Sequence, residues 1–229
     1  VFITADSVDG TGGAISANGD GGTHGYSGQG GGGRIAIVLT GSDTVGAGVT
    51  LAAYGGASNA RVGAAGTIYI EGQGDGPGGG VITVDNNGKV NTGSPTQPFT
   101  LLPPSYDGTQ SSYPFPEYGY SDDLSAATLI LEDAARVALT GDLAVAAAVL
   151  GTGTLLDLAG YTLTVFSFTD PDGDAWTEGG TYGDNLSGWF DGVSFSGGSI
   201  VILTAIPEPA SAALLAAAGL LSLRRRRGA

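Results

Sequence analysis

The sequence contains no cysteine, no methionine and only one histidine. Without cysteine the chain has no disulfide framework, no thiolate metal site and no cysteine nucleophile. A catalytic triad or a histidine-ligated metal would have to use His24, which stands in a glycine-rich stretch typical of a solvated loop. These absences exclude sites built on cysteine and restrict sites built on histidine to this one residue.

Basic residues are also scarce: 8 Lys and Arg stand against 22 Asp and Glu, for a net charge of -14. Half of the basic residues are consecutive arginines near the C-terminus, so residues 1–205 carry 21 acidic and only 4 basic side chains. An acidic body repels nucleic acid and offers no basic surface for phosphates. We therefore expect no nucleic-acid partner.

Glycine is the residue in excess, with 43 residues, about 19% of the chain against roughly 7% in average proteins. It clusters instead of recurring at every third position, which excludes a collagen triple helix. A mean hydropathy of +0.17 and 41% hydrophobic residues argue against wholesale disorder. The chain is expected to fold.

Residues 1–91 alternate glycine-rich stretches with short β-branched segments that recur in a paired order. Aligning Ala17 with Ala53 and Gly33 with Gly66 gives offsets of 36 and 33 residues, within the range of solenoid repeats. Glycine at the corners of such coils permits positive φ and close stacking. We expect a glycine-rich β-solenoid here, with further strands at residues 1–4 and 81–85.

Residues 92–123 hold six of the ten prolines, which disfavour sheet pairing and indicate a spacer or a long wrapping loop. Two roles stay open for its tyrosines, stacking on sugar rings or packing the spacer against the body. The tyrosines are Tyr106, Tyr113, Tyr118 and Tyr120.

Residues 124–205 predict a second β-solenoid segment, closed by a cap that begins at residue 169. Residues 144–150 have helical propensity, but a segment this short without caps is unstable as a helix, so we expect β structure. Whether the two β segments form one continuous stack stays open. Strands are expected at 128–131, 135–139, 142–145, 154–158, 161–165 and 199–204.

Three carboxylates, Asp170, Asp172 and Asp174, stand at alternate positions, as at the start of a calcium loop. The pattern then departs, because Ala175 replaces the required glycine and Thr181 stands where a bidentate Glu belongs. Two interpretations stay open: a weak extracellular Ca²⁺ site or an ordinary acidic turn. No other cofactor is expected.

The C-terminal tail, residues 206–229, combines three features in order. It has the motif Pro207, Glu208 and Pro209, an uncharged apolar run over 210–223, and a terminal arginine cluster. As a helix the apolar run would span about 21 Å, and arginines that snorkel to the cytoplasmic surface would help it span the membrane. A buried C-terminal helix would explain neither the arginines nor the helix-breaking motif. The cluster is Arg224, Arg225, Arg226 and Arg227.

This order of motif, apolar span and arginine cluster resembles the PEP-CTERM sorting signal of exported bacterial proteins. The resemblance implies that a short C-terminal transmembrane helix holds the chain in the inner membrane. An exosortase then processes it near Pro207–Pro209 and passes the body to the cell surface or extracellular matrix. It implies destination and not activity. Residues 156–165 are also similar to strand repeats of large bacterial surface proteins.

The expected protein is therefore a non-enzymatic surface or matrix component. Its fold is all-β, a right-handed parallel β-helix or solenoid with a C-terminal transmembrane helix. Its partners are the exosortase, the inner membrane and exopolysaccharide. Because the chain begins at Val1 with an apolar segment and has no methionine, we interpret it as the C-terminal piece of a longer protein.

Two alternatives stay open. A carbohydrate-active β-helix enzyme, a polysaccharide lyase or hydrolase, would need carboxylates converging with Arg34, Arg61 or Arg136. A carbohydrate-binding module would use the tyrosine-rich spacer and Trp176 or Trp189.

Overall fold

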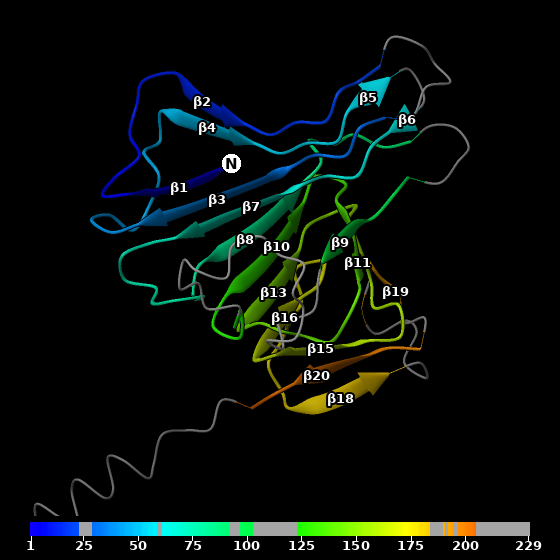
Figure 1. Cartoon of the computed structure of the whole chain (residues 1–229). Coiled ribbons are helices and arrows are strands. Elements are labelled where there is room, and N and C mark those ends of the chain that lie inside the picture. The colour runs from blue at the N-terminus through cyan, green and yellow to red at the C-terminus, as the bar shows by residue number, and fades with distance from the viewer. Residues whose placement is uncertain are drawn as a thin grey trace, which may run out of the picture.

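The structure is a computed structural model that describes residues 1–22, 29–58, 61–91, 97–102, 123–183, 190, 192–194 and 197–204. Every regular secondary-structure element in this part of the chain is a β-strand (Figure 1), which confirms the all-β expectation. No helix in the described ranges has the length and apolar character to span a bilayer. The tail, with the expected transmembrane segment, lies outside the described residues.

The strands follow one another closely, and most of the expected ones are present within a residue or two of the expected bounds. In the first half they are β1 (Phe2–Ala5), β2 (Gly13–Ser16), β3 (Arg34–Leu39), β4 (Val49–Ala52), β5 (Ala57–Ser58), β6 (Arg61–Val62), β7 (Thr67–Glu71), β8 (Val81–Asp85) and β9 (Thr100–Leu102). In the second half they are β10 (Thr128–Glu132), β11 (Arg136–Leu139), β12 (Leu143–Ala144), β13 (Ala147–Leu150), β14 (Leu155–Asp157), β15 (Thr162–Val165), β16 (Ser167–Thr169), β17 (Ala175–Trp176), β18 (Gly180–Gly183), β19 (Val193–Ser194) and β20 (Ser199–Ile202).

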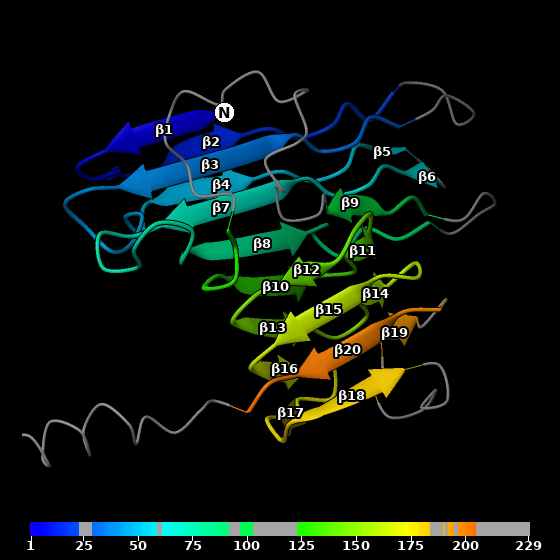
Figure 2. The same ribbon diagram turned by 60° about the horizontal axis from the view of Figure 1, so that its bottom comes forward.

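One sheet runs through the whole body and joins its two halves (Figure 2). This long sheet has eight strands in the order β1-β3-β7-β8-β10-β13-β16-β17. The second sheet has the order β19-β14-β11-β9 and the third sheet the order β12-β15-β20-β18, while β2–β4 and β5–β6 form two-stranded sheets. The two β segments expected from the sequence therefore belong to one continuous stack.

The first half contains the expected repeat. Parallel strands β1, β3 and β7 stack in the long sheet, and β2 stacks in parallel on β4. Gly13 lies opposite Val49, an offset of 36 residues, and Arg34 lies opposite Thr67, an offset of 33. Both registers are those predicted from the sequence alignment, so each repeat unit forms one coil.

The second half is wound into tighter, three-sided coils. Consecutive strands β10, β11 and β12 belong to the long, second and third sheets, and β13, β14 and β15 repeat that order one coil later. Thr128 lies opposite Ala147 and Leu143 opposite Leu163, so one coil takes 19 or 20 residues. Alternate side chains of each strand point into one apolar core, among them the fully buried Leu129.

The two halves place their cores on opposite faces of the long sheet. In β7, Ile68 belongs to the core of the first half, whereas its neighbour Tyr69 packs against the core of the second half. Tyr69 lies opposite the buried Ile82 of β8, and residues paired across a ladder point to the same face. The interior of the protein therefore changes face between β7 and β8.

Strand direction reverses at the same place, because β7 and β8 pair antiparallel. The hand of a coil depends on strand direction and on the face of the sheet where the coil closes. Either reversal alone would invert the hand, but the two together preserve it across the junction. The same winding rule therefore holds for both halves, as expected where one hand is strongly preferred for parallel crossovers.

The sheets are nevertheless mixed, unlike the purely parallel β-helix expected from the sequence. Antiparallel pairs join β5 to β6, β7 to β8, β16 to β17 and β18 to β20. Strand β9 lies within the range expected as a proline-rich spacer and pairs with β11 in the second sheet. Its residues, Thr-Leu-Leu, contain no proline, so nothing prevents the segment from joining the ladder.

Four glycine-rich segments of the first half, residues 17–21, 30–33, 53–56 and 63–66, lie side by side, and we call them the glycine bundle. Their backbones approach too closely for side chains, because a Cβ at Gly32 would overlap Ala53 O and Gly66 N. Backbone hydrogen bonds join the segments: Gly19 N to Tyr54 O (2.8 Å), Gly32 N to Ala64 O (2.9 Å), Gly56 N to Gly30 O (2.9 Å) and Gly63 N to Gly56 O (2.8 Å).

Candidate functional site

The three carboxylates expected as calcium ligands lie in a hairpin loop near one end of the stack. The loop, residues 170–174, connects β16 to the antiparallel strand β17. Asp170 N donates to Asp174 O (3.1 Å) and Gly173 N donates to Asp170 O (3.0 Å), which closes the turn. Gly173 has a φ of 89°, a left-handed conformation that favours glycine.

The Asp170 side chain satisfies donors of its own loop. It is 5% exposed, and its Oδ1 accepts hydrogen bonds from the backbone N–H groups of Asp172 (3.1 Å) and Asp174 (2.9 Å). Its Oδ2 accepts one from the indole N–H of Trp176 (3.4 Å). Such bonds are typical of aspartate side chains that organise turns.

These contacts account for the alternating carboxylates without a cation. The side chains of Asp172 and Asp174 are exposed, whereas that of Asp170 turns inward. Within the described ranges, no group of three or more His, Cys, Asp or Glu side chains is placed to hold a metal ion. Of the two interpretations of this sequence, the geometry favours the acidic turn.

Replacing Asp170 by alanine should lower the free energy of unfolding by about 1–3 kcal/mol, because it leaves three partly buried donors without their acceptor. Asp174→Ala is the matched control, since the contribution of Asp174 to the turn is its backbone; a change within about 0.5 kcal/mol is expected. Urea unfolding followed by circular dichroism measures both. Equal losses for the two variants would contradict this role of Asp170.

An aromatic cluster packs beside this loop at the end of the stack. The Phe190 ring is 3% exposed and makes edge-to-face contacts with Phe168, Trp176 and Tyr182 at centroid distances of 5.0, 4.9 and 5.2 Å. Trp176, one candidate for a sugar-stacking platform, is thus engaged in packing. Trp189 and the spacer tyrosines lie outside the described residues.

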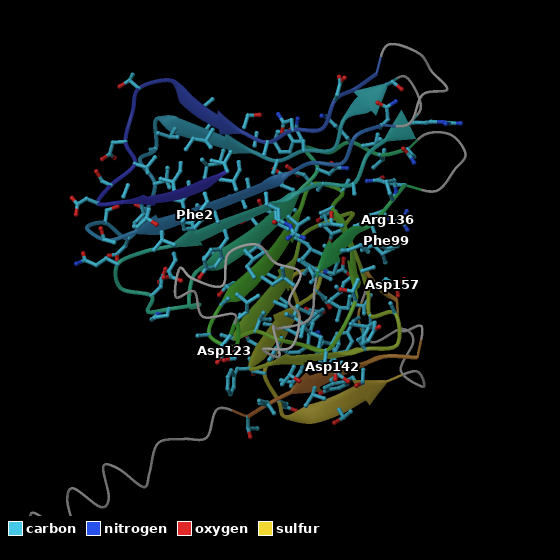
Figure 3. All side chains as sticks on the ribbon, in the orientation of Figure 1. Phe2, Phe99, Asp123, Arg136, Asp142 and Asp157 are labelled. Atoms are coloured by element: carbon cyan, nitrogen blue, oxygen red, sulfur yellow. The ribbon has the colours of Figure 1, made fainter. Side chains whose placement is uncertain are left out.

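The arginines that an enzyme site would need lie in three different sheets. Arg34 begins β3 in the long sheet, Arg61 lies in β6 opposite Ser58, and Arg136 begins β11 in the second sheet. Figure 3 shows Arg136 next to Phe99 on one side of the body. The guanidinium stands 4.4 Å from the Phe99 ring centroid, so the two side chains stack.

The fourth basic residue of the body, Lys89, contacts the glycine bundle. Its Nζ donates to Gly55 O (3.2 Å) and lies 5.5 Å from the Tyr54 ring centroid. Burial, and secondarily the charge of Asp85, raise the pKa of the Tyr54 phenol. Next to it, the fully buried Asn86 accepts a hydrogen bond from Gly55 N (2.9 Å).

Sequence reasoning missed this polar contact set. The available signal was an amide and a lysine directly after a strand, in a chain where basic residues are rare. Its hydrogen-bond partners are backbone atoms of Gly55, which no side-chain pattern reveals.

An apolar corner lies where the described chain ends. Strand β15 turns at Phe166, and β20 ends next to Leu203, whose N–H donates to Val165 O (2.7 Å). The β15–β20 register extends to place Phe166 beside Leu203, and Phe166 N donates to Ala146 O (3.0 Å) one coil earlier. Phe166 is 45% exposed and Leu203 40%. We call Ala146, Phe166 and Leu203 the exit corner.

The sorting residues 207–209 and 224–227 and His24 lie outside the described residues. No protein-family model matches the chain, and neither a curated protein nor a solved structure shows significant similarity to it.

Proposed function

We propose that this chain is a non-enzymatic structural protein of the bacterial cell surface or extracellular matrix, delivered through a C-terminal PEP-CTERM signal. The observation that carries the proposal is the order of Pro207–Pro209, uncharged run and four arginines at the end of the chain. Its body is a right-handed parallel β-solenoid with an antiparallel junction, and a short transmembrane helix over 210–223 follows it.

The architecture of the body suits such a role. A sheet of eight strands extends from one end to the other, so the backbone hydrogen bonds themselves form a continuous scaffold. The last strand of the long sheet is β17 and that of the third sheet is β18, and each pairs antiparallel with its neighbour. The acidic charge of residues 1–205 favours solubility and weak contacts with cations or polysaccharide.

The position of the motif suits processing. Thr204 is the last described residue, and Pro207 follows three positions later. Two prolines within three residues disfavour helix and strand, which suits a segment that a protease must bind. Cleavage at this point would release a body whose strands are all intact.

The proposal is tested by expressing the chain behind a cleavable export signal in a Gram-negative host, with and without an exosortase. Loss of the last 20 or so residues and release to the surface should occur only when the exosortase is present. A variant with Pro207, Glu208 and Pro209 replaced by alanine should stay intact and membrane-held. An intact product in both hosts, or processing of the alanine variant at the same position, would refute the sorting function.

A further inference from the structure

We propose that the exit corner is a lipid-contacting surface, on which the body rests against the membrane while its tail is still attached. This inference depends on the proposed attachment through the tail. It adds a second membrane contact, made by the body itself. It assigns the contact to Phe166 and Leu203, with Ala146 beside them.

The corner is a single apolar column. Ala146, Phe166 and Leu203 stand at the same turn in three successive coils, held in line by the Phe166–Ala146 and Leu203–Val165 backbone hydrogen bonds. Turn residues in an acidic, soluble protein are ordinarily polar, because loops face water. Two large apolar side chains, each 40% exposed or more, therefore call for a partner.

Uncharged residues flank the exit corner along the chain, and the carboxylate that lies beside it in space is that of the exposed Glu178, because Gly179 packs against Thr204. The residues next to the three corner positions along the chain are all uncharged, although residues 1–205 carry 21 acidic side chains. A carboxylate at any of the three corner positions themselves would repel an anionic lipid surface and resist dehydration. The adjoining residues are Val145, Ala147, Val165, Ser167, Ile202 and Thr204.

The length of the connecting chain identifies the partner. Only residues 205–209 separate Thr204 from the apolar run that begins at Ala210, and a segment of this length spans at most about 20 Å. A membrane-inserted tail would therefore hold the end of β20, and the exit corner with it, close to the interface. Apolar side chains presented at that depth bind the boundary between headgroups and acyl chains.

The opposite end of the body supplies a matched reference. Phe2 on β1 is 51% exposed, comparable to Phe166, but β1 is at the other end of the long sheet from β16 (Figure 1). Leu101 on β9, 58% exposed, lies in the second sheet. Neither is near the point where the tail leaves the body.

The absence of cysteine makes the test direct, because single cysteines can be labelled without background. The full chain is reconstituted into phosphatidylethanolamine–phosphatidylglycerol vesicles with an environment-sensitive fluorophore at Phe166→Cys, Leu203→Cys or Thr204→Cys. Phe2→Cys and Leu101→Cys are the controls. Shallow doxyl-labelled lipids should quench the labels at Phe166, Leu203 and the adjoining Thr204 several-fold more than the two controls. Circular dichroism checks that each labelled variant is folded.

Vesicle flotation distinguishes a failure of the exit-corner contact from a failure of membrane attachment. Equal quenching at all five positions in chains that float with the vesicles would overturn the exit-corner contact and leave membrane attachment intact. Chains that do not float would overturn both. The corner labels could also report a buried environment that depends on protein concentration and is not quenched by doxyl lipid. That result would show that a second copy of the chain covers the corner, which also refutes the proposal.

Discussion

Gly32→Ala is expected to lower the free energy of unfolding by about 3 kcal/mol, the upper part of the range for insertions that force packed backbone apart. A Cβ at this position would overlap the carbonyl oxygen of Ala53 and the amide nitrogen of Gly66 in the glycine bundle. Both are backbone atoms and cannot swing aside. Separating the segments would also strain the hydrogen bond from Gly32 N to Ala64 O.

The neighbouring glycine gives the control. A Cβ at Gly31 would have Ala64 O as its nearest contact, at an ordinary distance of 3.8 Å. Gly31→Ala should therefore be neutral, or stabilise by up to about 1 kcal/mol through the lower entropy of the unfolded chain. Urea unfolding of the two variants tests the pair. Similar stabilities for both would mean that the bundle is not packed as described.

Phe168→Ala is expected to cost about 3–5 kcal/mol of unfolding free energy, the usual loss for a fully buried phenylalanine. Phe168 is 0% exposed in the core of the second half and contacts the Phe190 ring edge to face. Its removal leaves a cavity between the last coil and the aromatic cluster. Thermal and urea unfolding by near-ultraviolet circular dichroism would also show the loss of ring packing.

Phe166→Ala, two residues before Phe168 and at the exit corner, is the control for this second prediction. Because Phe166 is 45% exposed, truncation should lower the unfolding free energy by only about 1 kcal/mol in solution, roughly the share expected for a half-buried side chain. A loss comparable to that of Phe168→Ala would show that the exit corner is part of the core.

The repeat was predictable because local composition alone determines it. Strand-forming residues between glycine runs specify where strands begin, and the 36- and 33-residue offsets specify which strands stack. The registers of Gly13 with Val49 and of Arg34 with Thr67 confirm both. Residues 144–150, where helix and strand competed, contain the end of β12 and all of β13, because coils on either side supply the pairing that a short helix lacks.

The junction between the halves was not predictable in the same way. Alternation along a strand shows which residues share a face, but not whether the next strand runs parallel or antiparallel. In Thr67–Glu71 the alternation is ambiguous, since Ile68 and Ile70 serve one core and Tyr69 the other. Only the complete pairing reveals that the interior changes sides there.

The candidate sites show a similar division. The spacing of Asp170, Asp172 and Asp174 was visible, but whether a carboxylate binds a cation or its own loop depends on its direction, which the hairpin fixes. The exit corner was hidden because Phe166 and Leu203 are 37 residues apart and meet only through the β15–β20 register.

The continuous long sheet also has a mechanical consequence. Its strands run across the stack, so their hydrogen bonds point along the direction in which a surface protein held at its tail would be stretched. Force applied between β1 and the end of β20 would peel one strand at a time instead of shearing many bonds at once. Such a body would extend coil by coil at modest tension, each coil of the second half releasing 19 or 20 residues.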